Sequence, residues 1–190
     1  MAKSLYEMTL EELWQLFPVL LRPYNPEYPQ WYEEERGVLA TALGSACRIR
    51  HIGSTSVPGL TAKPTIDILM EVPVDTVLPE LDCKLLACGY STMAFAAPPA
   101  FRQDLCKGYT VNGFAERVFH LHVVFYGDWD EPYFCEFLRR HPEAAREYEV
   151  LKSSLAAEFK HNRDAYTNAK TQFVQKYTQK ARSEFPGIFR

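Results

Sequence analysis

The hydrophobic period of the sequence changes twice, and these changes restrict the fold more than any other feature. Apolar residues recur at helical spacing up to about residue 43 and alternate at strand spacing in segments between residues 47 and 126. Helical spacing returns after Trp129. This order predicts a mixed sheet flanked by helices, which is an α+β or α/β architecture with a helical C-terminal region.

Capping and turn signals place the expected elements along the chain. Thr9 and Glu12 form a capping box before a short first helix, and Gly44 ends a second helix over residues 29–43. Strand patterns cover residues 47–50, 65–72 and 117–126, with weaker signals at 90–95 and 108–111. Helical patterns cover residues 77–88 and 132–140 and two later stripes, from Ala144 to Phe159 and from Tyr166 to Tyr177.

The length and composition predict one globular domain over residues 1–190 that needs no disulfide or structural metal to fold. With 190 residues, 47% of them hydrophobic, the chain can bury about 70% of the surface that it exposes when unfolded. The five cysteines form no CxxC pair and are expected to be reduced thiols, as in the cytoplasm. They are Cys47, Cys83, Cys88, Cys106 and Cys135.

Charge and hydropathy restrict the partners. The 21 basic and 24 acidic residues nearly balance, which argues against a protein that coats nucleic acid through phosphate neutralisation. The first residues, MAKSLYEMTLEEL, lack the apolar core of a signal peptide, and no apolar run approaches the roughly 18 residues of a membrane span. We therefore expect a cytoplasmic protein with a small-molecule partner and no membrane association.

The stretch HIGSTSVPGLTAKPTIDILMEV, residues 51–72, carries the strongest chemical signal. Gly53 and Ser54 follow a strand, where backbone N–H groups and a small hydroxyl can approach a phosphate closely because glycine lacks a Cβ atom. Asp67, on the next strand, is placed to hold a divalent ion against that phosphate. A tight strand exit and a hydrogen-bonded edge residue are the purely structural alternative for the same pattern.

A second carboxylate is missing from this strand pattern. Two carboxylates at positions i and i+2 of a strand share one face and can close onto a metal ion, but position i+2 from Asp67 is Leu69. Glu71 shares the face but lies about 13 Å along the strand from Asp67, too far to bind the same ion directly. A two-carboxylate metal site is therefore incomplete in this strand.

Two histidines on one strand face offer other ligands. In RVFHLHVVFYG, His120 and His122 project from the same face of an apolar strand, a spacing suited to metal binding, phosphate contact or acid–base work. If this strand neighbours the Asp67 strand, Asp67 and both histidines form one polar cluster. Six cations are candidates to line the same cleft: Arg48, Arg50, Lys63, Arg102, Lys107 and Arg117. The sequence contains no GxxxxGK[ST], GxGxxG, GxSxG or HExxH motif.

In combination, four stretches resemble the GrpB (UPF0157) family, which is related to the nucleotidyltransferase-like superfamily. They are RPYNPEYPQWYEEE at residues 22–35, HIGSTSVPGLTAKPTIDILMEV at 51–72, HLHVV at 120–124, and FLRRHPEAAREYEVLKSSLA with the later YTNAKTQFV. The resemblance implies a nucleotidyltransferase-like fold in which the Gly-Ser loop follows the first core strand and acidic residues lie on the next. Gly53 and Ser54 match the phosphate-binding Gly-Ser pair, and Asp67 matches the first metal carboxylate.

The resemblance and the residues together lead to two hypotheses. In the first, a nucleotidyltransferase-like enzyme or a degenerate relative binds a nucleotide or another phosphorylated small molecule with Gly53, Ser54, Thr55, Lys63 and Arg102. Its Mg²⁺ or Zn²⁺ ion is held by Asp67, His120 and His122, with Asp67 and His122 as catalytic residues. In the second, the chain is a non-catalytic interaction or assembly module, and Tyr24, Tyr28 and Trp31 form its docking surface.

Overall fold

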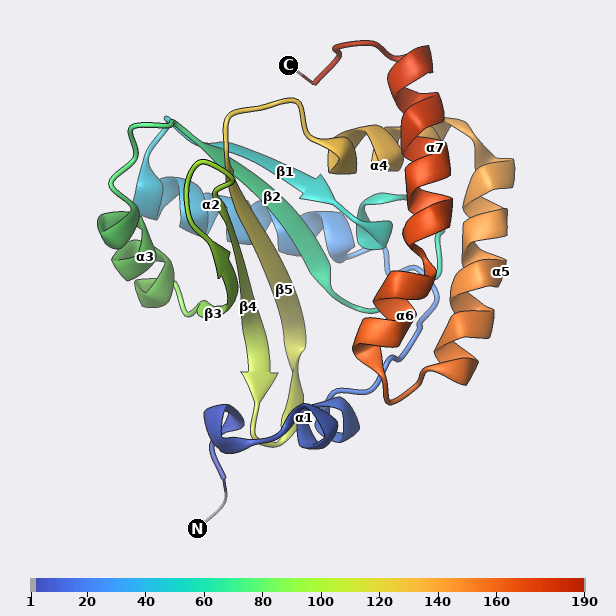
Figure 1. Ribbon diagram of the computed structural model, residues 1–190, viewed down its shortest axis with the longest axis horizontal. Coiled ribbons are helices and arrows are strands. Elements are labelled where there is room, and N and C mark those ends of the chain that lie inside the picture. Colours follow the sequence, from blue (N-terminus) through green and yellow to red (C-terminus); the bar gives the residue numbers. More distant parts are fainter. Residues whose placement is uncertain (1–2, 190) are drawn as a thin grey trace.

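A five-stranded mixed sheet forms the centre of the computed structural model, which describes residues 3–189 (Figure 1). The strands are β1 (Arg48–Ile52), β2 (Ile66–Val72), β3 (Ser91–Ala96), β4 (Arg102–Thr110) and β5 (Gly113–Phe125). They lie in the order β1-β2-β5-β4-β3; β2 and β5 are parallel and the other neighbours are antiparallel. The expected α+β class, a mixed sheet flanked by helices, is confirmed.

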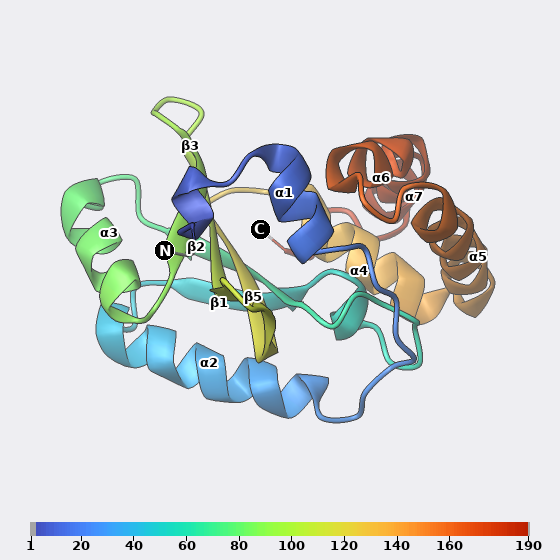
Figure 2. The same ribbon diagram turned by 90° about the horizontal axis from the view of Figure 1, so that it is seen from below.

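Helices α2 (Tyr28–Leu43) and α3 (Leu78–Ala87) cover one face of the sheet, as Figure 2 shows from below. The even positions of β2, from Ile66 to Val72, are almost fully buried in one cluster with the side chains of these helices. Tyr28 and Trp31 belong to that cluster, with exposures of 2% and 9%. The expected docking surface is therefore wrong for Tyr28 and Trp31, whose rings pack in the core.

The helices after the sheet gather beside its other face. They are α4 (Asp130–Arg140), α5 (Pro142–Glu158), α6 (Arg163–Ala169) and α7 (Thr171–Glu184). A second cluster joins α4, α5 and α7 through Tyr133, Phe137, Tyr148 and Tyr177. The single helix expected from the stripe between Tyr166 and Tyr177 is wrong. It breaks at Lys170, and Tyr166, before the break, packs in a separate cluster with Val19 and Leu155.

The N-terminal residues form a 3₁₀ turn, η1 (Leu5–Glu7), and helix α1 (Leu10–Leu16), which lies near the ends of β4 and β5 (Figure 1). The expected capping box is present, since the Glu12 amide donates to Thr9 Oγ1 and the Thr9 amide donates to Glu12. All five cysteines are free, as expected. No helix within residues 3–189 is long and apolar enough to cross a membrane.

Two strands differ from their expected ranges. Strand β4 begins at Arg102 and β5 at Gly113, both earlier than the sequence pattern predicts. The pairing register of β4 shifts between Lys107 and Tyr109, where Gly108 has a φ of +91°. A bulge of this kind reverses the alternation of faces, which explains why the pattern divides the hairpin incorrectly.

Candidate functional site

A cavity of about 540 Å³, the site cavity, opens between the sheet face that carries Asp67 and helices α4 to α7. Seven of the residues singled out in the sequence line it: Gly53, Ser54, Lys63, Asp67, Arg102, His120 and His122. Strand β5 lies beside β2 with Asp67 opposite His120 and Leu69 opposite His122. The expected adjacency of the two strands is confirmed, and it places the polar residues in one cavity.

Gly53 allows the turn from β1 to approach Asp67. Its φ is +71° with ψ of −175°, a conformation that residues with a Cβ atom rarely adopt. A Cβ atom at this position would lie 2.3 Å from Asp67 Oδ2. The turn continues into the 3₁₀ turn η2 (Ser54–Ser56), so Ser54 and the Asp67 carboxylate face the same cavity.

Asp67 and His120 form a buried polar pair. His120 Nδ1 lies 3.2 Å from Asp67 Oδ1. Burial alone would raise the pKa of Asp67, but the hydrogen bond from His120 and the charges of His120, His122 and Lys63 lower it below its usual value. Burial lowers the pKa of His120 to about 4, so the imidazole is neutral at pH 7. Nδ1–H then donates to Asp67, and Nε2 is left to accept.

The Nε2 acceptor of His120 is used by two neighbours. The Tyr109 hydroxyl lies 2.8 Å from Nε2, and Arg163 Nη2 lies 2.9 Å from the same atom. Tyr109 and His120 also stack, with ring centroids 5.8 Å apart. His120 therefore positions Asp67 on one side and Arg163 on the other, which leaves its ring nitrogens little capacity for a metal ion.

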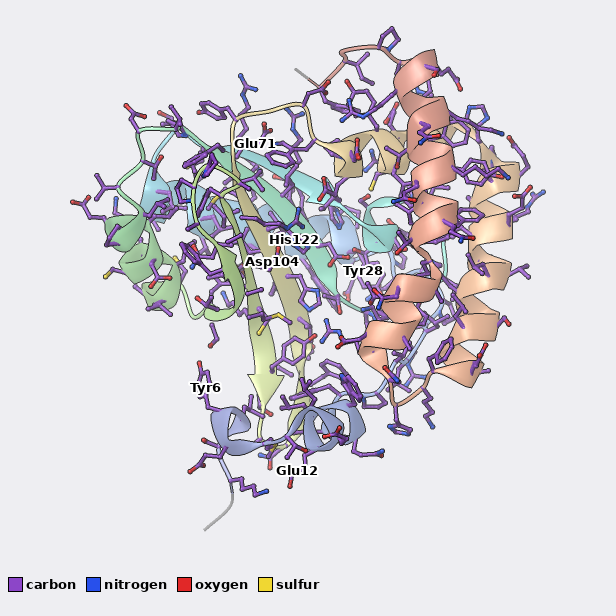
Figure 3. All side chains as sticks on the ribbon, viewed as in Figure 1. Tyr6, Glu12, Tyr28, Glu71, Asp104 and His122 are labelled. Carbon is purple, nitrogen blue, oxygen red and sulfur yellow. The ribbon has the colours of Figure 1, made fainter. Side chains whose placement is uncertain are left out.

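His122 has a separate set of partners on β4 and α4. Its Nδ1 lies 2.6 Å from Asp104 Oδ1, and Asp104 sits opposite it in the β4–β5 register. Arg102 Nε is 3.0 Å from Asp104 Oδ1, and Arg102 Nη1 is 3.0 Å from Glu131 Oε1. We call Arg102, Asp104, His122 and Glu131 the paired cluster; Figure 3 shows Asp104 and His122 side by side on the sheet. Arg102 Nη2 also lies 3.2 Å from His122 Nδ1, but a guanidinium only donates, so it forms no hydrogen bond with an Nδ1 that donates its proton to Asp104. In that tautomer Nε2 is the nitrogen left as a proton acceptor.

Four cations from distant segments form the opposite side of the cavity. We call them the basic cluster: Lys63, Lys152, Arg163 and Lys170. Lys152 is 2% exposed; its Nζ donates to Ser54 Oγ at 3.1 Å and to the Thr61 carbonyl. Lys63 and Lys170 lie over the Tyr166 ring, with Nζ 5.8 Å and 4.2 Å from its centroid.

Burial and mutual repulsion weaken the basicity of this cluster. Burial is the main cause that lowers the pKa of Lys63 to about 7, and Arg163 and Lys170 lower it further. The pKa of Lys152 falls to about 7 and that of Lys170 to about 8, again mainly through burial. None of the four cations forms an ion pair with a carboxylate in the described part of the chain. The cluster is thus a concentration of unpaired positive charge, which suits an anion.

Several site residues were not recognised in the sequence. Asp104 supplies a further carboxylate on the sheet side of the cavity, from β4 instead of from position 69, where Leu69 packs with Ile52 and Val124. Lys152 lies within the apolar stripe of α5, one turn after Tyr148, and a lysine in such a stripe is a detectable signal. Arg163 begins α6 and Lys170 follows its last residue, and their role depends on how that helix folds back over the sheet.

Other expected residues lie outside the cavity. Thr55 is 1% exposed, and its hydroxyl donates to the Thr65 carbonyl and contacts His51 instead of lining the cavity. Of the remaining expected cations, Lys107 and Arg117 pair with glutamates of α2, and Arg48 lies over Tyr126. Arg50 pairs with the buried Glu71. These four cations are occupied elsewhere on the sheet.

The cavity can hold a divalent ion only together with oxygen ligands from a bound phosphate. Within residues 3–189, no group of three or more His, Cys, Asp or Glu side chains is arranged to hold a metal ion. Asp67 and His120 bond to each other, and His122 bonds to Asp104. Mg²⁺ commonly takes one or two protein carboxylates together with water and ligand phosphates. Asp67 fits such a partial site only when a phosphate completes the coordination.

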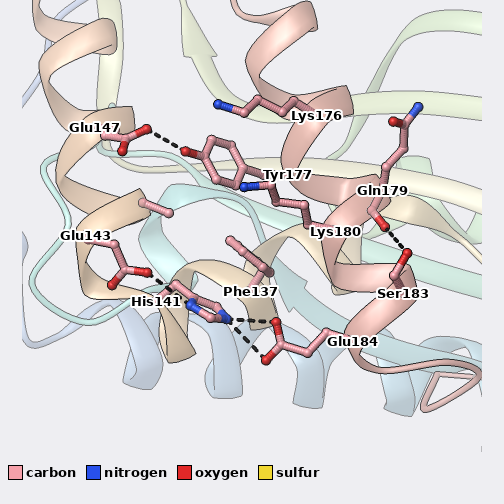
Figure 4. Close-up of a pocket in the computed structure, with 11 residues that line it drawn as sticks. Phe137, His141, Glu143, Glu147, Lys176, Tyr177, Gln179, Lys180, Ser183 and Glu184 are labelled. Atoms are coloured by element: carbon pink, nitrogen blue, oxygen red, sulfur yellow. Dashed lines mark hydrogen bonds and ion pairs between the residues drawn. The ribbon is translucent and has the colours of Figure 1, made fainter.

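A larger hollow of about 850 Å³ lies between α4, α5 and α7, shown in Figure 4. His141 contacts both Glu143 and Glu184, and the Tyr177 hydroxyl donates to Glu147. Its three carboxylates bond to His141 or to Tyr177, and its two lysines lie over the Tyr177 ring. It therefore lacks the charge excess that distinguishes the site cavity.

Comparison with known proteins gives consistent matches. The family model described as GrpB protein matches residues 18–180. A UPF0157 protein of Pseudomonas aeruginosa is 35% identical over 161 residues, which cover 84% of this chain and 66% of that protein. The glutamate-rich protein GrpB of Alkalihalophilus pseudofirmus is 30% identical over 161 residues, 82% of this chain and 91% of that protein. A UPF0157 protein of Bacillus subtilis is matched over 46% of its length, so this chain spans two thirds or less of some relatives.

Solved structures agree with the sequence matches. The crystal structure of the conserved protein GrpB from Enterococcus faecalis superposes with a TM-score of 0.75 and 30% identity. The match covers 87% of this chain and 99% of that chain. A weaker likeness, with a TM-score of 0.46 and 9% identity, is to the Cid1 poly(U) polymerase and covers 75% of this chain and 43% of the other.

Proposed function

The chain belongs to the GrpB protein family, and from this premise and the geometry of the site cavity we propose that it binds a nucleotide or another phosphorylated small molecule there. The observation that carries the proposal is the basic cluster. Four cations surround one end of the cavity, and three of them are lysines with a pKa of about 7 or 8. A bound phosphate would supply the negative charge that the cluster lacks.

Each side of the cavity has a distinct part in the proposal. Ser54 contacts a phosphate from the sheet side through its hydroxyl and its backbone amide, while Lys152 and Lys170 approach it from the helices. Asp67, with the phosphate, holds a divalent ion, which would supply charge neutralisation. If the bound nucleotide is a triphosphate and is transferred, an attacking hydroxyl forms a bond to the α-phosphorus, the bond to the leaving diphosphate breaks, and His122, oriented by Asp104, accepts the proton of the hydroxyl.

Calorimetric titration with inorganic diphosphate, AMP, ADP and ATP tests the proposal. We expect affinity to increase with the number of phosphates, because each adds charge against the basic cluster. Lys170→Gln should weaken diphosphate binding at least tenfold. Arg102→Gln should change it less than threefold, since Arg102 is already paired with two carboxylates. The absence of binding, or equal affinities for the wild type and Lys170→Gln, would rule the proposal out.

A second titration separates the divalent ion from the phosphate site. Asp67→Asn removes a negative charge next to the bound phosphate, so without divalent ions it should strengthen ATP binding a few fold. With Mg²⁺ or Zn²⁺ present, the same substitution removes a ligand and should abolish any gain that the ion gives the wild type. If the ion strengthens ATP binding equally in both proteins, Asp67 is not a metal ligand.

A further inference from the structure

A second cavity, of about 410 Å³, continues from the site cavity across the same face of the sheet. We call it the apolar cavity. Its floor includes Cys106, which lies two residues along β4 from Asp104 and therefore shares its face. Its roof is the N-terminal segment, with η1 and α1, which lies between β3 and α6 in Figure 2. The apolar side chains around it include Leu5, Leu10, Leu13, Trp14 and Met93.

Two residues join the two cavities. Met93 and Arg163 line both of them. The Arg163 guanidinium lies 2.9 Å from His120 Nε2 on the polar side, and its Cζ lies 5.5 Å from the Tyr109 ring centroid on the other. A ligand held by the basic cluster would therefore meet apolar side chains immediately beyond Arg163.

The N-terminal helix leaves this apolar surface open. Helix α1 contributes no buried residue, although Leu13 and Trp14 face the apolar cavity. Leu10 is 57% exposed and Met93 is 51% exposed, and Tyr6, labelled in Figure 3, is 84% exposed. Contiguous exposed apolar side chains commonly mark a binding surface. Here the surface is continuous with a cavity whose charge calls for an anionic ligand.

Building on the proposed function, we propose that the ligand carries an apolar arm of several carbons, which lies in the apolar cavity beneath α1 while its phosphates lie in the basic cluster. The ligand class is thus a phosphate or diphosphate ester of an alkyl or similar apolar group. Ligand phosphate and ligand hydrocarbon then meet at Arg163. Only the arm distinguishes this class from an ordinary inorganic anion.

The length of the alkyl group on the probe is the variable that tests for the apolar arm. The probes are inorganic diphosphate, ethyl diphosphate and hexyl diphosphate, titrated by calorimetry below the concentration at which the hexyl ester forms micelles. Each fully buried methylene strengthens binding about fourfold. Because the apolar cavity is partly open, we expect hexyl diphosphate to bind at least tenfold tighter than ethyl diphosphate. Equal affinity of the two esters, within twofold, overturns the proposal.

Two leucines of α1 provide a matched pair of variants. Leu13 lines the apolar cavity and Leu16 does not, and both are half-buried on the same helix. Leu13→Gln should remove most of the advantage of the hexyl ester without changing inorganic diphosphate binding, whereas Leu16→Gln should preserve that advantage. Equal losses in both variants would show a general effect on α1 and would overturn the proposal.

The remaining controls separate the arm from the phosphate site. Lys170→Gln should weaken all three probes by a similar factor. If it weakens none of them, the proposed function fails and the arm fails with it. If it weakens all three while chain length has no effect, only the arm fails. A concentration-dependent dimer that Leu13→Gln dissociates, with no chain-length effect, would assign the apolar surface to a second copy of the chain instead.

Discussion

The paired cluster and the basic cluster lie in the same cavity, but their charges are balanced differently. Arg102 is held by Asp104 and Glu131, each at 3.0 Å, and Asp104 also bonds to His122. The basic cluster assembles four cations around the single carboxylate of Asp67, which is itself bonded to His120. The first cluster has its counterions within the chain, whereas the second lacks them.

Charges that are paired within the chain can stabilise the fold, whereas unpaired buried charges become favourable only when a ligand neutralises them. A buried charge with a partner is tolerated, while an unpaired one lowers stability or loses its proton. Lysines whose pKa lies near 7 are the result of the second situation. Such local instability is typical of a binding site, because a ligand relieves it.

The largest expected effect is the pH dependence of the free energy of unfolding. The pKa of Lys63 and of Lys152 is about 7 in the folded chain and near 10.5 when unfolded, so between these values the unfolded state binds more protons. Stability without ligand should therefore rise from pH 7 to pH 9, by about 2 kcal/mol for each of the two lysines. Urea unfolding at several pH values measures this rise.

A lysine substitution and a ligand serve as controls for that rise. Lys152→Met should remove about 2 kcal/mol of it, and saturating diphosphate should flatten it by keeping the lysines protonated. Above pH 9 the trend should weaken, because burial raises the pKa of thiols such as Cys135 and the unfolded state then loses protons first. A flat profile between pH 7 and pH 9 in the wild type would contradict the description of the basic cluster.

The next effect concerns the turn that brings Asp67 to the basic cluster. Gly53→Ala combines an unfavourable φ with a Cβ atom 2.3 Å from Asp67 Oδ2, so we expect a loss of about 3 kcal/mol in unfolding free energy. Gly44→Ala is the matched control, since Gly44 has a φ of +83° and nothing within 4 Å of the added Cβ. It should lose less, about 2 kcal/mol, from the unfavourable backbone conformation alone. Equal losses would mean that the contact with Asp67 has no effect.

The sequence predicts the sheet side of the cavity well, because that side depends on local patterns. The alternation in β2 and β5 places Asp67, His120 and His122 on one face, and Gly53 stands where the turn needs it. These three residues can form one cluster only if β2 and β5 are neighbours, and the structure pairs the two strands. Strand β4 was harder, since the bulge at Gly108 interrupts the alternation that would have identified Asp104.

The helical side of the cavity depends on contacts between distant segments. Lys152 reaches Ser54 across 98 positions of sequence, and no local period encodes that contact. Lys170 lies where the expected single helix breaks into two, so its side chain could not be placed from the stripe alone. Arg102 was predicted as a phosphate ligand from its charge. Its partners Asp104 and Glu131 become visible only when β4 and α4 are placed together.

The smallest expected effect is the change in the free energy of unfolding when one cation of each cluster is replaced. We expect the two changes to have opposite signs. Arg102→Gln leaves Asp104 and Glu131 without their shared cation, and because all three are about one-third exposed we expect a loss of about 1 kcal/mol. Lys170→Gln removes a charge that burial disfavours more than the nearby Asp67 carboxylate favours it, so the ligand-free protein should become more stable by a similar amount. Urea unfolding of both variants at pH 7, against the wild type, measures the two signs. If both substitutions destabilise the chain, the basic cluster contributes to the fold in the same way as the paired cluster, and the distinction between them is lost.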